Sequence, residues 1–273
     1  MNPDYIDTVR LLLGIAPAVF ASGRFAMKGG TALNLFVQDM PRLSVDIDLV
    51  FVDHHPDRQA ALQLIGQELT IVKAALMRQG LRAHLPANAD GDDVKLVVSS
   101  DAAQVKVEVN YVFRGTVLPV ETRTLVGSAQ NLFTTDLTVP VLATAELYGS
   151  KLVAAMDRQH PRDLFDVMHM LDQFGWQSPF VDCFVAYLAG HNRPVHEVLF
   201  PKAKALEPAF MNEFAGMTRE EVSLDTLAQM QTRLLHELPR QLRSRGYAVG
   251  MPPPQGICSP PWKASPQTAG RSE

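Results

Sequence analysis

Hydrophobic and polar residues follow two different periods along the first half of the chain. Apolar residues recur every three or four positions over 4–22 and 56–79, and this period predicts two helices. Over 45–51 they occupy every second position, which predicts a strand with one buried face. Another helix is predicted to begin at Thr31, and the composition of 87–93 is typical of a hairpin turn. Further short strands are predicted over 25–28, 81–86, 94–99, 105–109 and 116–122.

The second half of the chain has only helical patterns. From Thr144 onward helices are predicted over 144–156, 161–174, 178–189, 203–214 and 223–245. Six prolines between Pro252 and Pro266 then mark a segment that cannot build a core. We therefore expect an α/β (α+β) core over 1–143, a helical domain over 144–245 and a disordered Pro-rich tail over 246–273.

Composition excludes several classes of protein. Hydrophobic residues make up 47% of the chain, which is too many for wholesale disorder. The net charge of −4 is unlike that of a polybasic nucleic-acid binder. Cys183 and Cys258 are too few for a disulfide framework or a zinc motif. The longest apolar run, 11–21, contains Pro17 and falls short of the roughly 18 residues of a membrane span, so we expect a cytoplasmic protein without membrane association.

A glycine pair precedes the second predicted helix. Gly29 and Gly30 allow the backbone to approach a ligand closely, and the free amides of a helix N-terminus suit phosphate oxygens. Thr31 is placed to cap this helix or to donate its hydroxyl to the same anion, and Lys28 adds a positive charge. Taken alone, the motif is explained about as well by a capped helix after a turn.

Three carboxylates are predicted to project from neighbouring strands. Asp46 and Asp48 alternate with apolar residues, so both point away from the core. Glu108 lies in a second alternating strand, on the same face as Lys106 and Asn110. If the two strands pair, the three carboxylates would form a cluster that selects Mg²⁺ and suits two-metal catalysis. A solvated strand face is the alternative interpretation of Asp-x-Asp by itself.

The helical half supplies a group of charged residues. Lys151 and Arg158 share a face if one helix runs through both, while Asp163 and Asp166 lie three positions apart beside Arg162. These residues are suited to a cationic clamp on a triphosphate, with an aspartate that accepts a proton from an attacking hydroxyl. A salt-bridged helix pair explains the same pattern without any chemistry.

Taken together, these motifs resemble a known family. Lys28-Gly-Gly-Thr-Ala-Leu33, followed by Arg42-x-Ser44-x-Asp46-Ile-Asp48, is similar to the first motif of AbiEii/AbiGii-type nucleotidyltransferases. These belong to the DNA polymerase β-like nucleotidyltransferase superfamily and are toxins of type IV toxin–antitoxin and phage-defence systems. The strand of Glu108, the helix of Lys151 and the segment 162–166 add further matches, so the resemblance covers 11–174. It implies a polymerase β-like mixed sheet with flanking helices, followed by an all-helical C-terminal lobe.

The resemblance implies transfer of a nucleoside monophosphate from ATP, GTP, CTP or UTP to an acceptor, which in some relatives is the 3′ end of tRNA. Asp46 and Asp48, with Glu108, would bind two Mg²⁺ ions. Asp163 would be the base, with Asp166 as the other possibility. A cognate antitoxin, such as a winged-helix DNA-binding protein, is implied as partner. The residues that would contact the nucleotide are Lys28, Gly29, Gly30, Thr31, Arg42, Ser44, Lys151, Arg158 and Arg162.

Other functions compete with this interpretation. A hydroxyl of a protein is the alternative acceptor, because no residue dictates RNA. A non-catalytic NTP-binding module would fit the glycines and cations, although such a relative would usually have lost a carboxylate. A Mn²⁺-dependent glycosyltransferase fits Asp46-x-Asp48 but not the glycine pair at the start of a helix.

Overall fold

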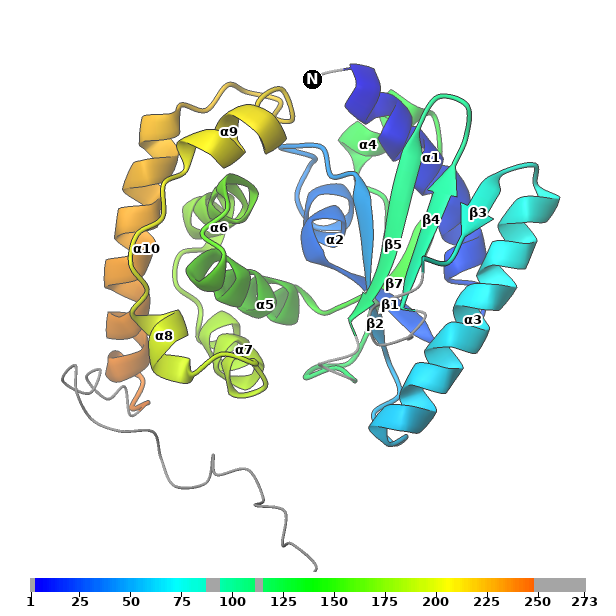
Figure 1. Ribbon diagram of the computed structural model, residues 1–273. Coiled ribbons are helices and arrows are strands. Elements are labelled where there is room, and N and C mark those ends of the chain that lie inside the picture. Colours follow the sequence, from blue (N-terminus) through cyan, green and yellow to red (C-terminus); the bar gives the residue numbers. More distant parts are fainter. Residues whose placement is uncertain (1–2, 87–93, 111–114, 248–273) are drawn as a thin grey trace, which may run out of the picture.

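The computed structural model describes residues 3–86, 94–110 and 115–247. The turn predicted at 87–93 and nearly all of the predicted tail lie outside these residues. A seven-stranded mixed sheet forms one lobe and a group of helices forms the other (Figure 1). The mixed sheet with flanking helices and the helical second half are both as predicted.

The sheet has the strand order β3-β4-β5-β2-β1-β7-β6. The strand β2 (Asp46–Phe51) is central, and it pairs parallel with β5 (Gln104–Asn110) and antiparallel with β1 (Phe25–Lys28). The strand β1 also pairs parallel with β7. The outer strands are β3 (Arg82–His84), β4 (Lys95–Ser99), β6 (Glu121–Thr124) and β7 (Thr138–Val141).

Helices cover both faces of the sheet (Figure 1). The helices α1 (Pro3–Val19) and α3 (Arg58–Arg78) pack against one another and against strands of the sheet. The helix α2 (Gly29–Phe36) contacts β1 and β2, and it also contacts α5 and α6 of the helical lobe. Because α2 follows β1 without a loop, its N-terminus lies where the two lobes meet.

The helical lobe begins with α5 (Thr144–Asp157), at the residue where the helical half was predicted to begin. The helix α5 packs most extensively on α7, and Gly149 makes this possible because a Cβ there would lie 2.5 Å from the Cβ of Cys183. The other helices are α6 (Pro161–Phe174), α7 (Ser178–Ala189), α8 (Val195–Leu199), α9 (Glu207–Glu213) and α10 (Leu224–Ser244).

Several predicted boundaries were wrong. The helix predicted from Thr31 begins at Gly29, and the strand predicted over 116–122 is β6, Glu121–Thr124. Residues 117 and 118 do not join a strand because their backbone N–H groups donate to the carboxylate of Glu146 instead. The helix α4 (Gly127–Phe133), the strand β7 and the helix α8 were not predicted, and only Glu207–Glu213 of 203–214 is helical. The strand β7 was not predicted because it contains Pro140, and proline is rare inside strands.

Within the described residues, α3 is the one helix that is long and apolar enough to cross a membrane by length and composition alone. Its buried residues include Ile65, Leu69 and Val72, which lie on the side that packs in this fold. Glu68 on the same helix is buried and forms an ion pair with Arg24 (3.4 Å). One side of α3 is therefore packed against the protein, and the other side is exposed.

Candidate active site

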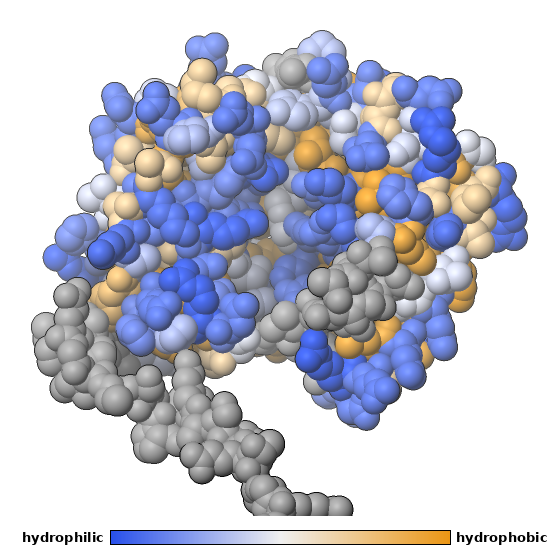
Figure 2. Space-filling view, in the orientation of Figure 1, coloured by the Kyte–Doolittle hydropathy of each residue, from blue (hydrophilic) through white to orange (hydrophobic). Residues whose placement is uncertain are grey.

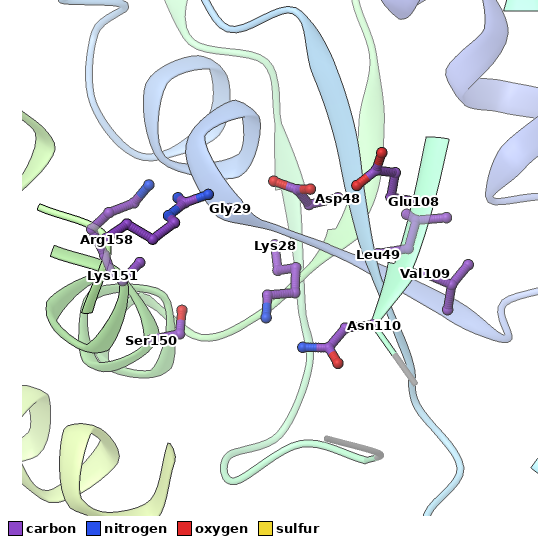
Figure 3. Close-up of a pocket in the computed structure, with 11 residues that line it drawn as sticks. Lys28, Gly29, Asp48, Leu49, Glu108, Val109, Asn110, Ser150, Lys151 and Arg158 are labelled. Atoms are coloured by element: carbon purple, nitrogen blue, oxygen red, sulfur yellow. The ribbon is translucent and has the colours of Figure 1, made fainter. Parts of the chain in front are cut away.

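The three predicted carboxylates lie on one face of two adjacent strands. The parallel pairing of β2 with β5 places Asp46 opposite Lys106 and Asp48 opposite Glu108, which confirms the expected pairing. The intervening apolar residues of both strands are buried, as alternation requires. The three carboxylates therefore project from the same side of the sheet and line one cavity with Lys151 and Arg158. Figure 3 shows Asp48 and Glu108 on the side that faces the helical lobe.

The glycine pair lies directly against this cluster. Gly29 has a φ of +74°, and a Cβ at this position would lie 2.1 Å from Oδ2 of Asp48. A Cβ at Gly30 would lie 2.6 Å from Nη2 of Arg42. Glycine is therefore required at both positions, because the backbone of Gly29 lies against a carboxylate and that of Gly30 lies against a buried guanidinium, with no room for a Cβ.

Thr31 does not cap α2, contrary to one of the predicted roles. The N-cap residue is Lys28, and it makes no side-chain capping bond. The buried hydroxyl of Thr31 is hydrogen-bonded to the Ser44 hydroxyl (2.9 Å) and to the carbonyl oxygen of Asp46. Thr31 and Ser44 therefore tie the first turn of α2 to the beginning of β2.

Lys151 of α5 and Arg158, which follows the last residue of α5, converge on Asp163 of α6. The Lys151 ammonium lies 3.0 Å from Oδ1 of Asp163, and Arg158 donates to both oxygens of that carboxylate at 3.0 and 2.9 Å. Burial by itself would raise the pKa of Asp163, but these two cations outweigh it and hold that pKa below its ordinary value. The sequence-predicted clamp and the predicted base are therefore one cluster.

A fully buried ion pair between Arg42 and Asp166 contacts this cluster through Lys151. Arg42 donates to the two oxygens of Asp166 at 2.8 and 2.7 Å, and Asn34 donates to the same carboxylate at 3.1 Å. Lys151 bridges the two aspartates, since its ammonium also lies 3.0 Å from Asp166. Arg42 and Asp166 are only 2% and 0% exposed. They join α6 to the segment between α2 and β2.

Adjoining cavities of about 160, 250 and 280 Å³ form a groove between the two lobes. Figure 2 shows this face as largely hydrophilic and hollowed between the lobes. Asp46, Arg162 and Asp163 line one end, and Tyr187 lines the other. The middle, shared between neighbouring cavities, is lined by Lys28, Asp48, Glu108, Asn110, Ser150, Lys151, Ala154 and Arg158 (Figure 3).

The carboxylate cluster is electrostatically costly without a cation. Burial raises the pKa of Asp48, with Asp46 and Glu108 adding repulsion and with Lys28 and Lys151 opposing the shift. Burial likewise raises the pKa of Asp46. Glu108 is held by Lys95, at 2.5 Å. Desolvated, mutually repelling carboxylate oxygens are the donor set that a hard divalent cation such as Mg²⁺ requires, so the residues fit that metal.

The sequence did not reveal two polar residues that support the site. Glu146 is 0% exposed and accepts hydrogen bonds from two backbone N–H groups of the 115–120 loop and from the hydroxyl of Tyr187 (2.9 Å). Asn34 donates to the carbonyl of Gly30 as well as to Asp166. The only signal for either was a polar residue between apolar neighbours in the sequence.

Substituting Ala for Gly29 should weaken ligand binding in the groove while leaving the protein folded. The methyl group would displace the Asp48 carboxylate and would strain the backbone at its positive φ by about 1 kcal/mol. Nucleotide binding, measured with a fluorescent NTP, should weaken at least about tenfold, because the displaced group lies in the groove itself. Gly80→Ala is a matched control, since Gly80 also has a positive φ but open space around it. Equal NTP binding by the two variants would contradict the placement of the nucleotide site at Gly29 and Asp48.

The fold and the site are those of a nucleotidyltransferase-type protein. Carboxylates cluster on a mixed sheet, beside the two glycines that begin a helix, and a helical lobe places lysine and arginine opposite them. The family model described as "Nucleotidyl transferase AbiEii toxin, Type IV TA system" matches residues 10–254. The chain belongs to the AbiEii nucleotidyltransferase toxin family of type IV toxin–antitoxin systems.

Solved structures support the fold. The chain is similar to MenT4, the nucleotidyltransferase toxin Rv2826c from Mycobacterium tuberculosis H37Rv, with a TM-score of 0.61 and 18% identity over 88% of this chain and 89% of that one. A CdnC:HORMA-deltaN complex from E. coli MS115-1 matches with a TM-score of 0.28 and 9% identity over 92% and 88% of the two chains, which is too distant to inform the fold. No curated protein matches the chain.

Proposed function

We propose that the chain transfers a nucleoside monophosphate from an NTP to RNA in a Mg²⁺-dependent reaction, with the 3′ end of a tRNA as acceptor. One observation carries the proposal: Asp46, Asp48 and Glu108 share one face of two adjacent parallel strands, across a groove from Lys151 and Arg158. Such a groove suits a triphosphate, because it offers metal-binding carboxylates on one wall and cations on the other.

The two walls have different roles in this reaction. Asp46, Asp48 and Glu108 would hold Mg²⁺, which supplies charge neutralisation at the triphosphate when bound. Lys151 and Arg158 bind phosphate oxygens from the helical side, and the N-terminus of α2 at Gly29 and Gly30 contributes backbone amides. The acceptor hydroxyl forms a bond to the α-phosphorus while the bond to the β-phosphate oxygen breaks, and pyrophosphate leaves.

Asp163 is the better placed of the two candidate bases. It lines the groove, whereas Asp166 is not among the described residues that line it. Lys151 and Arg158 keep Asp163 ionised at neutral pH, as an acceptor of the hydroxyl proton must be, and engagement of these two cations by the triphosphate would raise the affinity of Asp163 for that proton. We assign Asp166 and Arg42 to positioning, along with Thr31 and Ser44, which hold the glycine turn.

An RNA acceptor is supported by the cations at the end of the groove near Asp46. Arg162 and Lys106 line this end, and Arg158 has a side chain that is 60% exposed. Cations on an otherwise acidic protein favour a polyanion locally. Because the family is that of type IV toxins, we propose that the cellular partner is a cognate antitoxin. We propose that this antitoxin is a winged-helix DNA-binding protein whose gene lies next to the gene of this chain.

Incubation with Mg²⁺, total tRNA and each α-labelled NTP in turn should label RNA, and Asp46→Ala should reduce labelling by at least about 10³-fold. Asp46 is the residue to change because its carboxylate lies on the face shared with Asp48 and Glu108. Periodate oxidation of the tRNA, which destroys its terminal ribose hydroxyls, should prevent labelling if the 3′ hydroxyl is the acceptor.

Asp53→Ala provides the control, since Asp53 is an exposed carboxylate beyond the end of β2 and should leave labelling unchanged. Label on protein rather than RNA would replace the RNA acceptor by a protein hydroxyl. Mg²⁺-dependent NTP binding without transfer to either would overturn the enzymatic proposal in favour of a binding module.

A further inference from the structure

The corner between α5 and α6 carries residues of the groove on both of its arms. Arg158 follows the last residue of α5, and Asp163 lies in the first turn of α6. Arg158 lines all three parts of the groove and donates to both oxygens of Asp163. The backbone between them therefore determines whether the guanidinium and the carboxylate meet.

Gln159, at this corner, adopts a backbone conformation that a side chain rarely takes. Its φ is +54°, in the left-handed region, and it is only 2% exposed. A non-glycine residue in this region is strained and persists only where its surroundings hold it in place.

The side-chain amide of Gln159 supplies that hold through three hydrogen bonds. Its Nε2 donates to the carbonyl of Lys202 (2.9 Å), and its Oε1 accepts from the backbone N–H of Lys204 (3.0 Å) and from Nε2 of Gln231 (2.7 Å). Gln231 lies on α10, is 6% exposed and also donates to the carbonyl of Lys204 (3.0 Å). The amide thus links the corner to an extended segment and to the last helix.

Neighbouring bonds hold the same corner from the same side. The Lys204 ammonium donates to the carbonyl of Asp157 (2.9 Å), the last residue of α5. His160, the N-cap of α6, contacts the carboxylate of Glu213 at 3.1 Å. Lys204 and Glu213 are not among the described residues that line the groove, whereas Arg158 and Asp163 are.

We propose that Gln159 is a positioning residue for the nucleotide: with Gln231 it fixes the α5–α6 corner so that Arg158 meets the triphosphate and Asp163. This inference rests on the proposed function. The groove would then be shaped by α10, a helix that contributes none of the described residues lining it.

Gln159→Gly tests the proposal, because glycine adopts the positive φ without strain and only the three hydrogen bonds are lost. We expect the Kd for a fluorescent NTP with Mg²⁺ to rise about 10- to 100-fold, and KM for the NTP to rise in parallel, since small displacements of positioned groups cost this much. In an Arg158→Ala background the same substitution should add little to either value, because its effect passes through Arg158.

Gln38→Ala is the control for loss of a buried glutamine. Gln38 is 5% exposed, donates to the hydroxyl of Tyr148 (2.8 Å) and lines a different cavity. It should lower the melting temperature with no change in the Kd for NTP. If Gln159→Gly lowers only the melting temperature, or weakens NTP binding equally with and without Arg158, the positioning role is wrong.

Gln231→Ala keeps the proposal testable should Gln159→Gly not fold, because Gln159 retains its two bonds to 202–204. A smaller rise of the Kd in the same direction is expected, and an unchanged Kd would contradict the link to α10. Transfer by the wild-type protein is measured separately, so its absence would reject the proposed reaction, while the Kd series would still decide the role of Gln159.

Discussion

Asp48→Asn should reduce nucleotidyl transfer by at least about 10³-fold and, in EDTA, should raise the melting temperature of the protein. The loss of transfer follows because the Asp48 carboxylate lies between Gly29 and Glu108, in the part of the groove where a metal-bound triphosphate would lie. Removing a metal ligand costs several kcal/mol of transition-state stabilisation. Labelled-NTP assays and thermal melts of the same preparations measure both effects.

The gain in stability follows from the raised pKa of Asp48. A carboxyl whose pKa is higher in the folded than in the unfolded protein destabilises the fold as the pH rises above its unfolded value. Burial is the main cause here, and the neutral amide removes the cost at pH 7. Glu108→Gln is the matched comparison, because Glu108 is 47% exposed in its side chain and already has Lys95 as a partner. Equal melting temperatures for wild type and Asp48→Asn in EDTA would show that the carboxylate cluster is not under electrostatic strain.

Alternation of polar and apolar residues over 46–49 and 104–110 made the carboxylate face predictable from the sequence. In β2 and β5 every second residue is apolar, so the faces of Asp46, Asp48 and Glu108 follow from the period of a strand. The register that sets Asp48 beside Glu108 was expected only if the strands paired, since no local feature encodes which residues of distant strands are neighbours. The same holds for Arg42 and Asp166, which lie 124 positions apart.

The backbone segments that could not be predicted from the sequence are those whose conformation depends on tertiary contacts. The segment 116–122 has a strand-like composition, but the buried Glu146 binds two of its N–H groups, and only Glu121–Thr124 pairs. The role of Gln159 could not be predicted from the sequence either, because neither its left-handed backbone nor its partners, Gln231 on α10 and the backbone of 202 and 204, leave a periodic pattern. In both cases hydrogen bonds of one buried polar side chain determine the backbone conformation, and secondary-structure propensities do not predict such bonds.

Asp166→Ala should destabilise the protein by about 3–5 kcal/mol, because it leaves Arg42 buried without its carboxylate and removes one of the two partners of Lys151. For a chain of this size that loss lowers the melting temperature by roughly 10 °C. The double variant Arg42→Met plus Asp166→Leu should recover most of the loss, since apolar residues of similar volume replace a buried ion pair at little cost. Asp172→Ala, on the same helix but exposed, should melt like the wild type.

Acid should act on the same pair. Burial by itself would raise the pKa of Asp166, but Arg42 and Lys151 outweigh it and hold that pKa far below its ordinary value. A carboxyl with a lowered folded pKa stabilises the fold above its unfolded value, about 4, and this contribution is lost as the pH falls toward the folded value. Wild type should therefore lose more stability between pH 5 and pH 2 than the apolar double variant, measured by urea denaturation at each pH. Parallel losses in the two proteins would mean that other carboxylates, and not the buried Arg42–Asp166 pair, dominate acid unfolding.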